Sequence, residues 1–301
     1  MARHNLVFLL GYVTLVQVHN TNAGEPYAMA YITVARSDRK AGDQRHYMKC
    51  DNPLIMSRDP DTIREMASWS QYDIVEIKGM IAAKNIGKKS FCPNCGEAKV
   101  ADGVIVYVNP IFAKKRGHKE TQDECIEFLS ENREISNQVF VFGELCRDPK
   151  KVTPKAGLTV TQYQIALNRK FRIAADPPEV RSDYPWVKSY GDNAMDDRAY
   201  LHVGSQVFID GCLQARKVQR HAVCEECGTK YDWADRALEI VPFETEYMAN
   251  FYTQEEVEAK KAAIKSEKIK GVLSGLVGYE EDADDEYTED DIKAGINSEE
   301  A

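Results

Sequence analysis

The sequence lacks the short signatures of several large enzyme classes. It contains no phosphate-cradling GxxxxGK[ST] segment, no GxSxG nucleophile motif and no HExxH metalloprotease motif. Its six histidines are scattered, and none lies at the spacing that would put two metal ligands on one helix face. We therefore expect a protein that is not an enzyme.

Long apolar runs are also missing. No stretch reaches the ~18 apolar residues that a membrane-spanning helix needs. The most apolar segment, LVFLLGYVTLVQV at 6–18, has the composition of an export signal, but VFVFGEL at 139–145 occupies the corresponding place in mid-chain, where no such signal could act. The pattern favours a β-strand. With eight cysteines and no export signal, we expect a cytoplasmic location.

The sequence does contain an internal repeat at an offset of 132 residues, the difference between Asn5 and Asn137. Six further pairs of glycine, cysteine or proline recur at the same offset: Gly11 and Gly143, Gly79 and Gly211, Cys92 and Cys224, Cys95 and Cys227, Gly96 and Gly228, and Pro110 and Pro242. Chance rarely aligns such residues, so we interpret the chain as a tandem duplication. Its 301 residues suit two domains.

Each copy predicts the same order of elements. A short apolar strand ends at a glycine, and an alternating strand follows at 28–36 or 160–169. A helix at 59–69 in the first copy, a further strand ending at a glycine, and a hairpin tipped by CxxCG complete the unit. Five short strands with one helix between the third and fourth indicate an OB barrel. The predicted fold is therefore mainly β, with two tandem five-stranded OB barrels, each with a CxxCG-tipped hairpin between its fourth and fifth strands.

The segments outside the barrels are charged. Thr121 with Glu124, and Thr253 with Glu256, form capping boxes that begin helices. Residues 280–301 contain eleven acids and one lysine, which leaves a net charge of +1 for the rest of a chain whose total is −9. This tail has too little apolar surface to fold alone. The predicted organisation is a first barrel at 1–112, a helical connector at 113–135, a second barrel at 136–250, a helical spacer at 251–278 and a disordered acidic tail at 279–301.

The second copy resembles the bacterial and phage single-stranded DNA-binding protein family. The matching pieces are NQVFVFGELCRDP at 137–149, the turn at Gly157, ALNRKFR at 166–172 and YLHVGSQVFIDGCLQARK at 200–217. The first copy shares the resemblance only through the repeat. The resemblance implies a protein that coats exposed single strands during replication, recombination or repair, in a bacterium or for a phage or mobile element. Because the family assembles four OB barrels, it also implies a homodimer of this two-barrel chain.

Binding single strands without sequence preference requires cations for phosphates and flat aromatic faces for bases. The basic candidates on the second copy are Arg169, Lys170, Arg172, Arg216, Lys217 and Arg220. By the resemblance, the stacking candidates are Phe171, Tyr184 and Tyr190. Trp186 lies between them and is interpreted as a core residue. Val218 stands where the family usually has a further aromatic, which predicts a weaker or shorter footprint.

The first copy predicts phosphate contact without base stacking. At the offset of the repeat, the three stacking positions correspond to Arg39, Asn52 and Arg58. This copy keeps basic residues that could contact phosphates, namely Arg36, Arg39, Lys40, Lys84, Lys88 and Lys89, and the chosen site candidates among them are Arg36, Arg39 and Lys84.

Two segments, FCPNCGEAK at 91–99 and AVCEECGTK at 222–230, have the form of zinc knuckles. A structural zinc ion needs four ligands, and each hairpin supplies two. We expect the hairpins to share one zinc through Cys92, Cys95, Cys224 and Cys227. The alternatives are that each pair borrows other ligands, that two chains share the ion, or that the turns hold no metal.

Two other functions remain open. One is an RNA-binding OB protein, because stacking tolerates both nucleic acids. The other is a zinc-containing scaffold that docks proteins without binding nucleic acid. In the resembled family an acidic tip recruits replication and recombination proteins and competes with DNA for the basic groove. The tail here ends NSEEA without the family's terminal Pro-Phe, so charge competition is expected of it rather than recruitment.

Overall fold

A computed structural model describes residues 4–21, 23–37, 48–152, 159–173, 176–250, 252, 255–259, 262–263 and 266. The elements of the first copy are β1 (Asn5–Asn20), β2 (Pro26–Ala35), β3 (Cys50–Asp51), β4 (Leu54–Ser57), α1 (Pro60–Ala67), β5 (Asp73–Phe91) and β6 (Ala98–His118). The connector contains α2 (Gln122–Glu131) and α3 (Arg133–Ser136). The second copy contains β7 (Asn137–Leu145), β8 (Lys150–Val152), β9 (Val160–Asn168), β10 (Ser182–Asp183), β11 (Trp186–Tyr190), α4 (Gly191–Tyr200), β12 (Gln206–Val223) and β13 (Lys230–Ala249).

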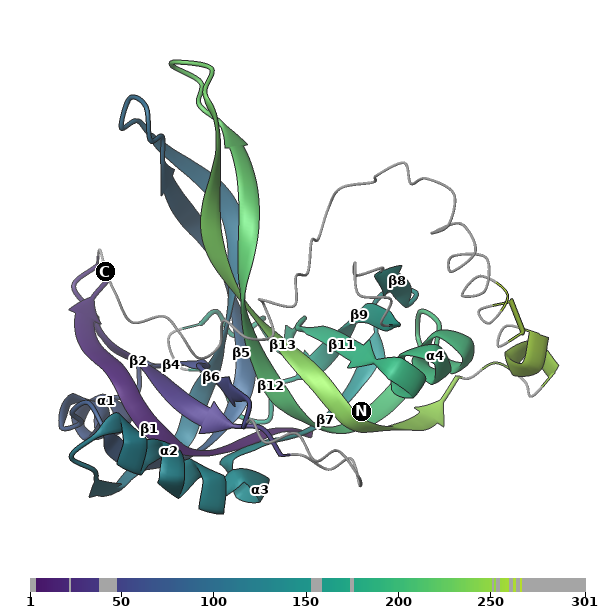
Figure 1. Ribbon diagram of the computed structural model, residues 1–301, viewed down its shortest axis with the longest axis horizontal. Coiled ribbons are helices and arrows are strands. Elements are labelled where there is room, and N and C mark those ends of the chain that lie inside the picture. Colours follow the sequence, from purple (N-terminus) through teal and green to yellow (C-terminus); the bar gives the residue numbers. More distant parts are fainter. Residues whose placement is uncertain are drawn as a thin grey trace.

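Each copy closes into a five-stranded barrel, and the two barrels lie next to each other (Figure 1). In the first, the strands pair in the circuit β1, β2, β4, β6, β5 and back to β1. In the second, the circuit is β7, β9, β11, β13, β12 and back to β7. Each circuit contains one parallel pair, β4 with β6 and β11 with β13. The predicted mainly β, OB-type fold is confirmed.

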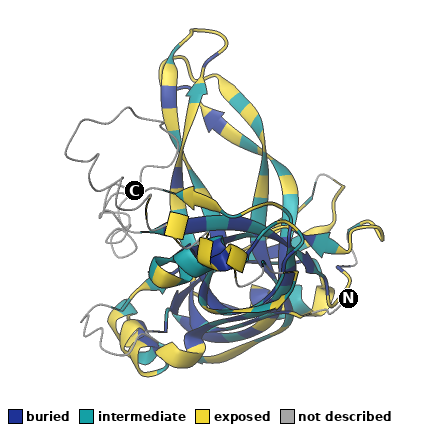
Figure 2. Ribbon diagram, turned by 90° about the vertical axis from the view of Figure 1, so that its right-hand side faces the viewer, coloured by how far each residue is buried: buried dark blue, intermediate teal, exposed yellow. Residues whose placement is uncertain are grey.

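Alternating burial explains the barrels. Along β7 every second residue is buried, which puts Val139, Val141 and Leu145 in the core. α1 begins as predicted, because the Asp59 side chain accepts a hydrogen bond from the backbone N–H of Thr62 at 2.9 Å. Buried residues gather inside the barrels, whereas the long hairpins are mostly exposed (Figure 2).

The glycines expected at strand ends lie within strands instead. β1 continues through Gly11 to Asn20, and β5 continues through Gly79 to Phe91. A Cβ at Gly11 would lie 2.3 Å from the Thr33 carbonyl oxygen, so only glycine permits this close crossing of strands. At Gly79 the pairing with β6 shifts register, which marks a β-bulge. The prediction of tight bends at these glycines was wrong. Gly11 instead lets two strands approach closely, and Gly79 lies at a β-bulge.

The barrels join through one antiparallel pairing of β1 with β7. Val7 pairs with Val139, its counterpart in the repeat, and Asn5 pairs with Val141 while Leu9 pairs with Asn137. The pairing is therefore symmetric about a local twofold axis at the valine pair. All strands then belong to one continuous hydrogen-bonded network. This is the arrangement that brings equivalent parts of the two copies together.

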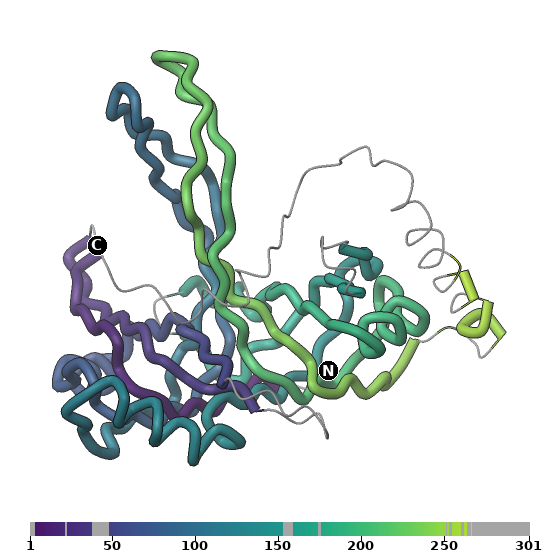
Figure 3. The backbone as a smooth tube through the Cα atoms, in the orientation of Figure 1, coloured from purple at the N-terminus to yellow at the C-terminus, as the bar shows by residue number. Residues whose placement is uncertain are grey.

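Two long hairpins leave the barrels on one side of the molecule (Figures 1 and 3). The first hairpin consists of β5 and β6, and the second of β12 and β13. Each turns at its CxxCG segment. These strands are far longer than the short strands that the sequence predicted, because pairing continues beyond the barrel wall.

The connector is partly helical. β6 continues to His118, and α2 starts at a Thr121 cap that accepts from the Glu124 N–H at 3.3 Å. Cys125 and Leu129 of α2 pack against the first barrel. Residues 255–259 of the predicted spacer are helical, whereas the predicted acidic tail at 279–301 lies outside the described residues. Within the described part of the chain, no helix is long and apolar enough to span a membrane.

Candidate nucleic-acid groove and cysteine cluster

A groove of about 1570 Å³ lies between the second barrel and the two hairpins. Its volume exceeds the ~300 to 1,000 Å³ of small-molecule pockets, which suits a chain-like ligand. Four aromatic side chains line it: Tyr184, Trp186, Tyr231 and Trp233. Eight cations line it: Lys84, Lys88, Lys99, Arg169, Arg216, Arg220, Lys230 and Arg236. Six carboxylates line it as well: Asp102, Asp176, Asp183, Asp232, Asp235 and Glu239.

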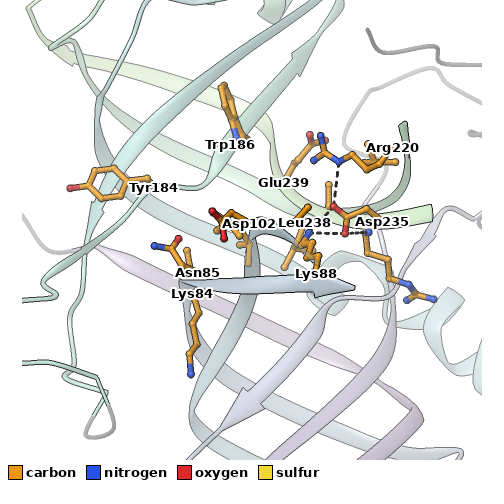
Figure 4. Close-up of a pocket in the computed structure, with 18 of the residues that line it drawn as sticks. Lys84, Asn85, Lys88, Asp102, Tyr184, Trp186, Arg220, Asp235, Leu238 and Glu239 are labelled. Carbon is orange, nitrogen blue, oxygen red and sulfur yellow. Dashed lines mark hydrogen bonds and ion pairs between the residues drawn. The ribbon is translucent and has the colours of Figure 1, made fainter. Parts of the chain in front are cut away.

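The barrel wall of the groove carries two available aromatic faces. Tyr184 precedes β11 and is 52% exposed. Trp186, the first residue of β11, is half-buried, and the Arg147 guanidinium carbon lies 5.5 Å from its ring centroid. Figure 4 shows both rings on the side of the groove formed by the second barrel. The interpretation of Trp186 as a core residue was wrong, because its strand position faces the groove that the hairpins create.

The hairpin wall is built from polar contacts between the two hairpins. Lys88 Nζ lies 2.6 Å from both carboxylate oxygens of Asp235, and Arg220 Nε lies 3.5 Å from Oδ2 of the same carboxylate (Figure 4). The Ser90 and Tyr231 hydroxyls are 3.0 Å apart and buried. The sequence indicated Lys88 and Arg220 as phosphate contacts but not their pairing with Asp235, because a contact across a repeat leaves no local pattern.

A buried ion cluster lies behind the groove. Arg216 forms two hydrogen bonds with Glu239, at 2.9 and 3.0 Å. Lys188 is fully buried, with its Nζ 3.9 Å from Glu239 Oε1. The cluster fixes the Arg216 guanidinium and the Glu239 carboxylate at the base of the groove.

Arg169 is buried, unlike the exposed cation that the sequence predicted. Its guanidinium donates to Asp183 at 2.6 and 2.8 Å and to Asp176 at 2.6 Å. The bonds to Asp183, followed by those to Asp176, raise the pKa of Arg169. Its side chain is 4% exposed, so its charge holds the loop after β9 in place.

Four other candidates are exposed and are not among the residues that line the groove. Phe171 is 44% exposed. Lys170 and Arg172 flank it on the same loop, and Lys217 lies on β12; all three are exposed.

Tyr190 at the end of β11 is half-buried and donates to Gln214 Oε1 at 3.2 Å. Burial, with the Glu239 charge, raises the pKa of Tyr190 to about 12. Its ring is therefore part of the framework next to α4, and it is absent from the groove lining.

The first copy contributes Lys84 to the groove lining. Burial, and then the nearby charge of Arg58, lowers the pKa of Lys84. Arg36 forms an ion pair with Asp51 at the interface between the barrels. The remaining candidate, Arg39, lies outside the described residues.

The interface between the barrels is symmetric. Asp51 of the first copy accepts from the Ala215 N–H at 2.8 Å, and Asp183 of the second copy accepts from the Ala83 N–H at 2.8 Å. These pairs are equivalent in the repeat. Arg36 bonds Asp51 and Arg169 bonds Asp183. Each arginine thereby orients the aspartate that accepts a backbone hydrogen bond from the hairpin of the other copy.

The four predicted metal ligands form one cluster at the hairpin tips. The thiol sulfurs of Cys92, Cys95, Cys224 and Cys227 all lie within 4.8 Å of one another. The distance between Cys92 and Cys227 is 3.6 Å, and that between Cys95 and Cys224 is 3.5 Å. Both are too long for a disulfide. A tetrahedral ion with bonds of about 2.3 Å separates its sulfurs by about 3.8 Å, so the cluster fits a metal ion. The expectation that the hairpins meet within one chain is confirmed.

The two CxxCG turns are built alike. The Gly96 N–H donates to the Cys92 carbonyl at 2.9 Å, and the Gly228 N–H donates to the Cys224 carbonyl at 3.0 Å. Both glycines have positive φ, +76° and +69°. The Thr229 hydroxyl and N–H lower the pKa of Cys227, whereas at Cys95 the Glu97 N–H lowers the pKa but hydrogen bonds with the other thiols raise it by more. A thiolate is the form of cysteine that binds metal.

Comparisons with known proteins agree with the fold. The family model "Single-strand binding protein family" matches residues 136–229. Single-stranded DNA-binding protein B of Bacillus subtilis (strain 168) is 31% identical over 83 residues, 28% of this chain and 72% of that protein. Single-stranded DNA-binding protein 1 of Staphylococcus aureus (strain MSSA476) is 31% identical over 83 residues, 28% of this chain and 52% of that protein. The chain thus spans about half the length of the Staphylococcus relatives it matches.

The fold extends beyond the matched segment. The crystal structure of the wild-type single-stranded DNA binding protein from Thermus aquaticus is similar with a TM-score of 0.52 and 16% identity, over 84% of this chain and 97% of that chain. A deletion mutant of the same Thermus protein gives a TM-score of 0.53 and 17% identity, over 85% of this chain and 100% of that chain. The fold and the groove define an OB-barrel protein with a surface suited to a polyanion. The chain belongs to the single-strand binding protein family.

Proposed function

We propose that this protein binds single-stranded DNA and coats exposed strands during replication, recombination or repair. The observation that carries the proposal is the groove beside the family-matched barrel, in which Tyr184 and Trp186 offer ring faces among cations. Stacking on such rings contributes about 1 to 3 kcal/mol per base and tolerates any base. Cations on the same surface provide phosphate contacts that do not depend on sequence.

The residues divide by burial. In this proposal Tyr184, Trp186 and Phe171 stack on bases, because their rings are exposed or line the groove. The proposed phosphate contacts are Lys84, Lys170, Arg172 and Lys217. Arg36, Arg169, Arg216 and Tyr190 then hold the framework, because their polar atoms are engaged inside the protein.

The direct test is a fluorescence titration of the full chain with oligo(dT) at two salt concentrations. We expect binding that weakens with salt, with a slope that counts the phosphates contacted. A parallel titration with oligo(rU) tests the RNA-binding alternative. Tighter binding to the RNA would replace DNA as the proposed ligand, and no binding to either would favour the protein-docking scaffold.

We also propose that the cysteine cluster holds a structural zinc ion. The donor set of four thiolates is typical of structural zinc. Elemental analysis of the purified protein should give one zinc per chain. Replacement of Cys92 and Cys224 together by serine should abolish it.

The assembly proposed is a homodimer, which would bring four OB barrels together in a bacterial cytoplasm. The acidic tail would compete with DNA for the basic surface, because both are polyanions. Sedimentation of the full chain tests the dimer. Removal of residues 279–301 should tighten oligo(dT) binding at low salt if the competition exists.

A further inference from the structure

The two hairpins depend on each other for their structure. A two-stranded hairpin is marginal in water by itself. Beyond the barrels, the first and second hairpins are mostly exposed (Figure 2). Their shared apolar cluster is small, consisting of Cys92, Cys224 and Tyr231 with Ala222 and Trp233 against them. Two of its three central members are proposed metal ligands.

The remaining contacts between the hairpins are polar and few. Ser90 bonds Tyr231 at 3.0 Å, and Lys88 bonds Asp235 at 2.6 Å. Near the tip, Lys99 Nζ donates to the Val223 carbonyl oxygen at 3.3 Å. The Lys99–Glu225 pair at 3.4 Å is exposed and contributes little, about 0 to 1 kcal/mol. The Lys88–Asp235 pair is largely buried, so the cost of desolvating its charges offsets much of their attraction. Without a metal ion, these contacts stabilise the association of the two hairpins only weakly.

The same residues form the wall of the groove. Lys88, Ser90, Lys99, Tyr231 and Asp235 all line it. Trp233 lines it as well, and it packs against the cluster that contains two of the four cysteines. The groove therefore keeps its shape only while the hairpins stay together. A metal ion bound by two thiolates of each hairpin adds a strong cross-link at their tips.

We propose that the metal site and the nucleic-acid groove are linked, so that the metal ion and the single strand each bind more tightly when the other is bound. This inference rests on the proposed function of the groove. The physical basis is that the metal stabilises the arrangement of hairpins that forms the wall, and a bound strand stabilises the same arrangement. The coupling must then be reciprocal, with one factor for both ligands.

The experiment measures both halves of the linkage on the full chain. The affinity for oligo(dT) is measured with zinc bound and after chelation. The affinity for zinc is measured by competition with a coloured chelator, with and without saturating oligo(dT). We expect chelation to weaken oligo(dT) binding by roughly 5- to 150-fold, the usual range of such couplings, and oligo(dT) to tighten zinc binding by the same factor.

Two variants separate the linkage from other effects. Cys146→Ser removes a thiol that belongs neither to the cluster nor to the groove lining, and should leave both affinities unchanged. Ser90→Ala combined with Tyr231→Phe removes a contact between the hairpins and leaves all four ligands in place. This double variant should still bind one zinc per chain, and its coupling factor should be larger, because fewer molecules keep the hairpins together when neither ligand is bound.

Specific results overturn the inference. Equal oligo(dT) affinity with and without zinc would overturn the proposed linkage and would leave the proposed function intact. Loss of binding accompanied by loss of barrel structure in far-ultraviolet circular dichroism would also do so, because the effect would then be global. Failure of the zinc-loaded protein to bind oligo(dT) is a different result, which defeats the proposed function itself.

Discussion

The side chain of Asn5 forms two hydrogen bonds with the backbone of Ile81, donating to its carbonyl oxygen at 2.9 Å and accepting from its N–H at 2.9 Å. Asn137 does the same with Leu213, also at 2.9 Å in both bonds. Both asparagines lie in the strands that join the barrels, and both are buried. They fix the start of each hairpin strand to the strand that joins the barrels.

Replacing Asn5 by alanine should destabilise the protein. The substitution leaves the buried N–H and carbonyl of Ile81 without partners, which costs about 1 to 3 kcal/mol for each unsatisfied group. The free energy of unfolding in urea is the measurement. Asn85→Ala is the matched control, because Asn85 lies on the same strand as Ile81 and is exposed. Equal stability of the two variants would contradict the structural role of Asn5.

Replacing Tyr184 by alanine should weaken oligo(dT) binding without unfolding the barrel. Loss of one stacked base contact costs about 1 to 3 kcal/mol, which is roughly a 5- to 160-fold rise in Kd. A fluorescence titration at fixed salt gives the value. Phe112→Ala is the control, since Phe112 is also an exposed aromatic but lies outside the groove lining. If both variants bind alike, bases stack elsewhere.

Much of the architecture could be predicted because a few residue types, such as paired cysteines and repeated glycines, fit only a few kinds of local structure. The paired cysteines can share a tetrahedral ion only if their hairpins meet, and the repeat placed those hairpins at equivalent positions. Three of the repeated residues have roles that involve the backbone. The Asn5 side chain bonds the backbone of Ile81, and Gly79 lies at the β-bulge, where it pairs with Pro110. Alternation in the second copy predicted β9 to within one residue.

The details of the groove could not be predicted, because they arise from contacts between the copies. Arg169 is a basic residue after a strand, and its sequence neighbours give no sign that Asp176 and Asp183 enclose it. Trp186 lies in a strand where alternation cannot distinguish core from groove. The deciding factor is the first hairpin, which closes over that face from another part of the chain.

Arg169 and Arg172 should respond differently to replacement by alanine. Arg169→Ala leaves Asp183 buried without its cation, which should cost about 3 to 5 kcal/mol of stability. Arg172 is exposed, so Arg172→Ala should leave stability unchanged and lower the salt slope of oligo(dT) binding by about one. Urea unfolding and the two-salt titration measure both variants. A normal stability for Arg169→Ala would show that its ion pairs are dispensable.

Asp197 should make the stability of the second barrel depend on pH. This residue of α4 is buried, and its carboxylate accepts from Tyr163 at 3.2 Å and from Tyr247 at 2.9 Å. Burial raises the pKa of Asp197 to about 6, against about 3.9 in an unfolded chain. Between these values the folded protein binds the proton more tightly than the unfolded chain does. The contribution of Asp197 to stability therefore rises as the pH falls from about 6 towards 4, and the cost of its buried charge is complete above that window.

Asp197→Asn isolates this effect, because the amide keeps the size of the side chain and cannot ionise. The difference in unfolding free energy between the original protein and the variant should change with pH inside the window and level off above it. Urea unfolding at several pH values from 4 to 7.5 measures the difference. Asp192→Asn, on the exposed side of the same helix, is the control and should give a flat difference. A flat difference for Asp197→Asn as well would mean that its carboxylate is ionised throughout, and that the two tyrosine hydroxyls stabilise the buried charge enough to offset its desolvation.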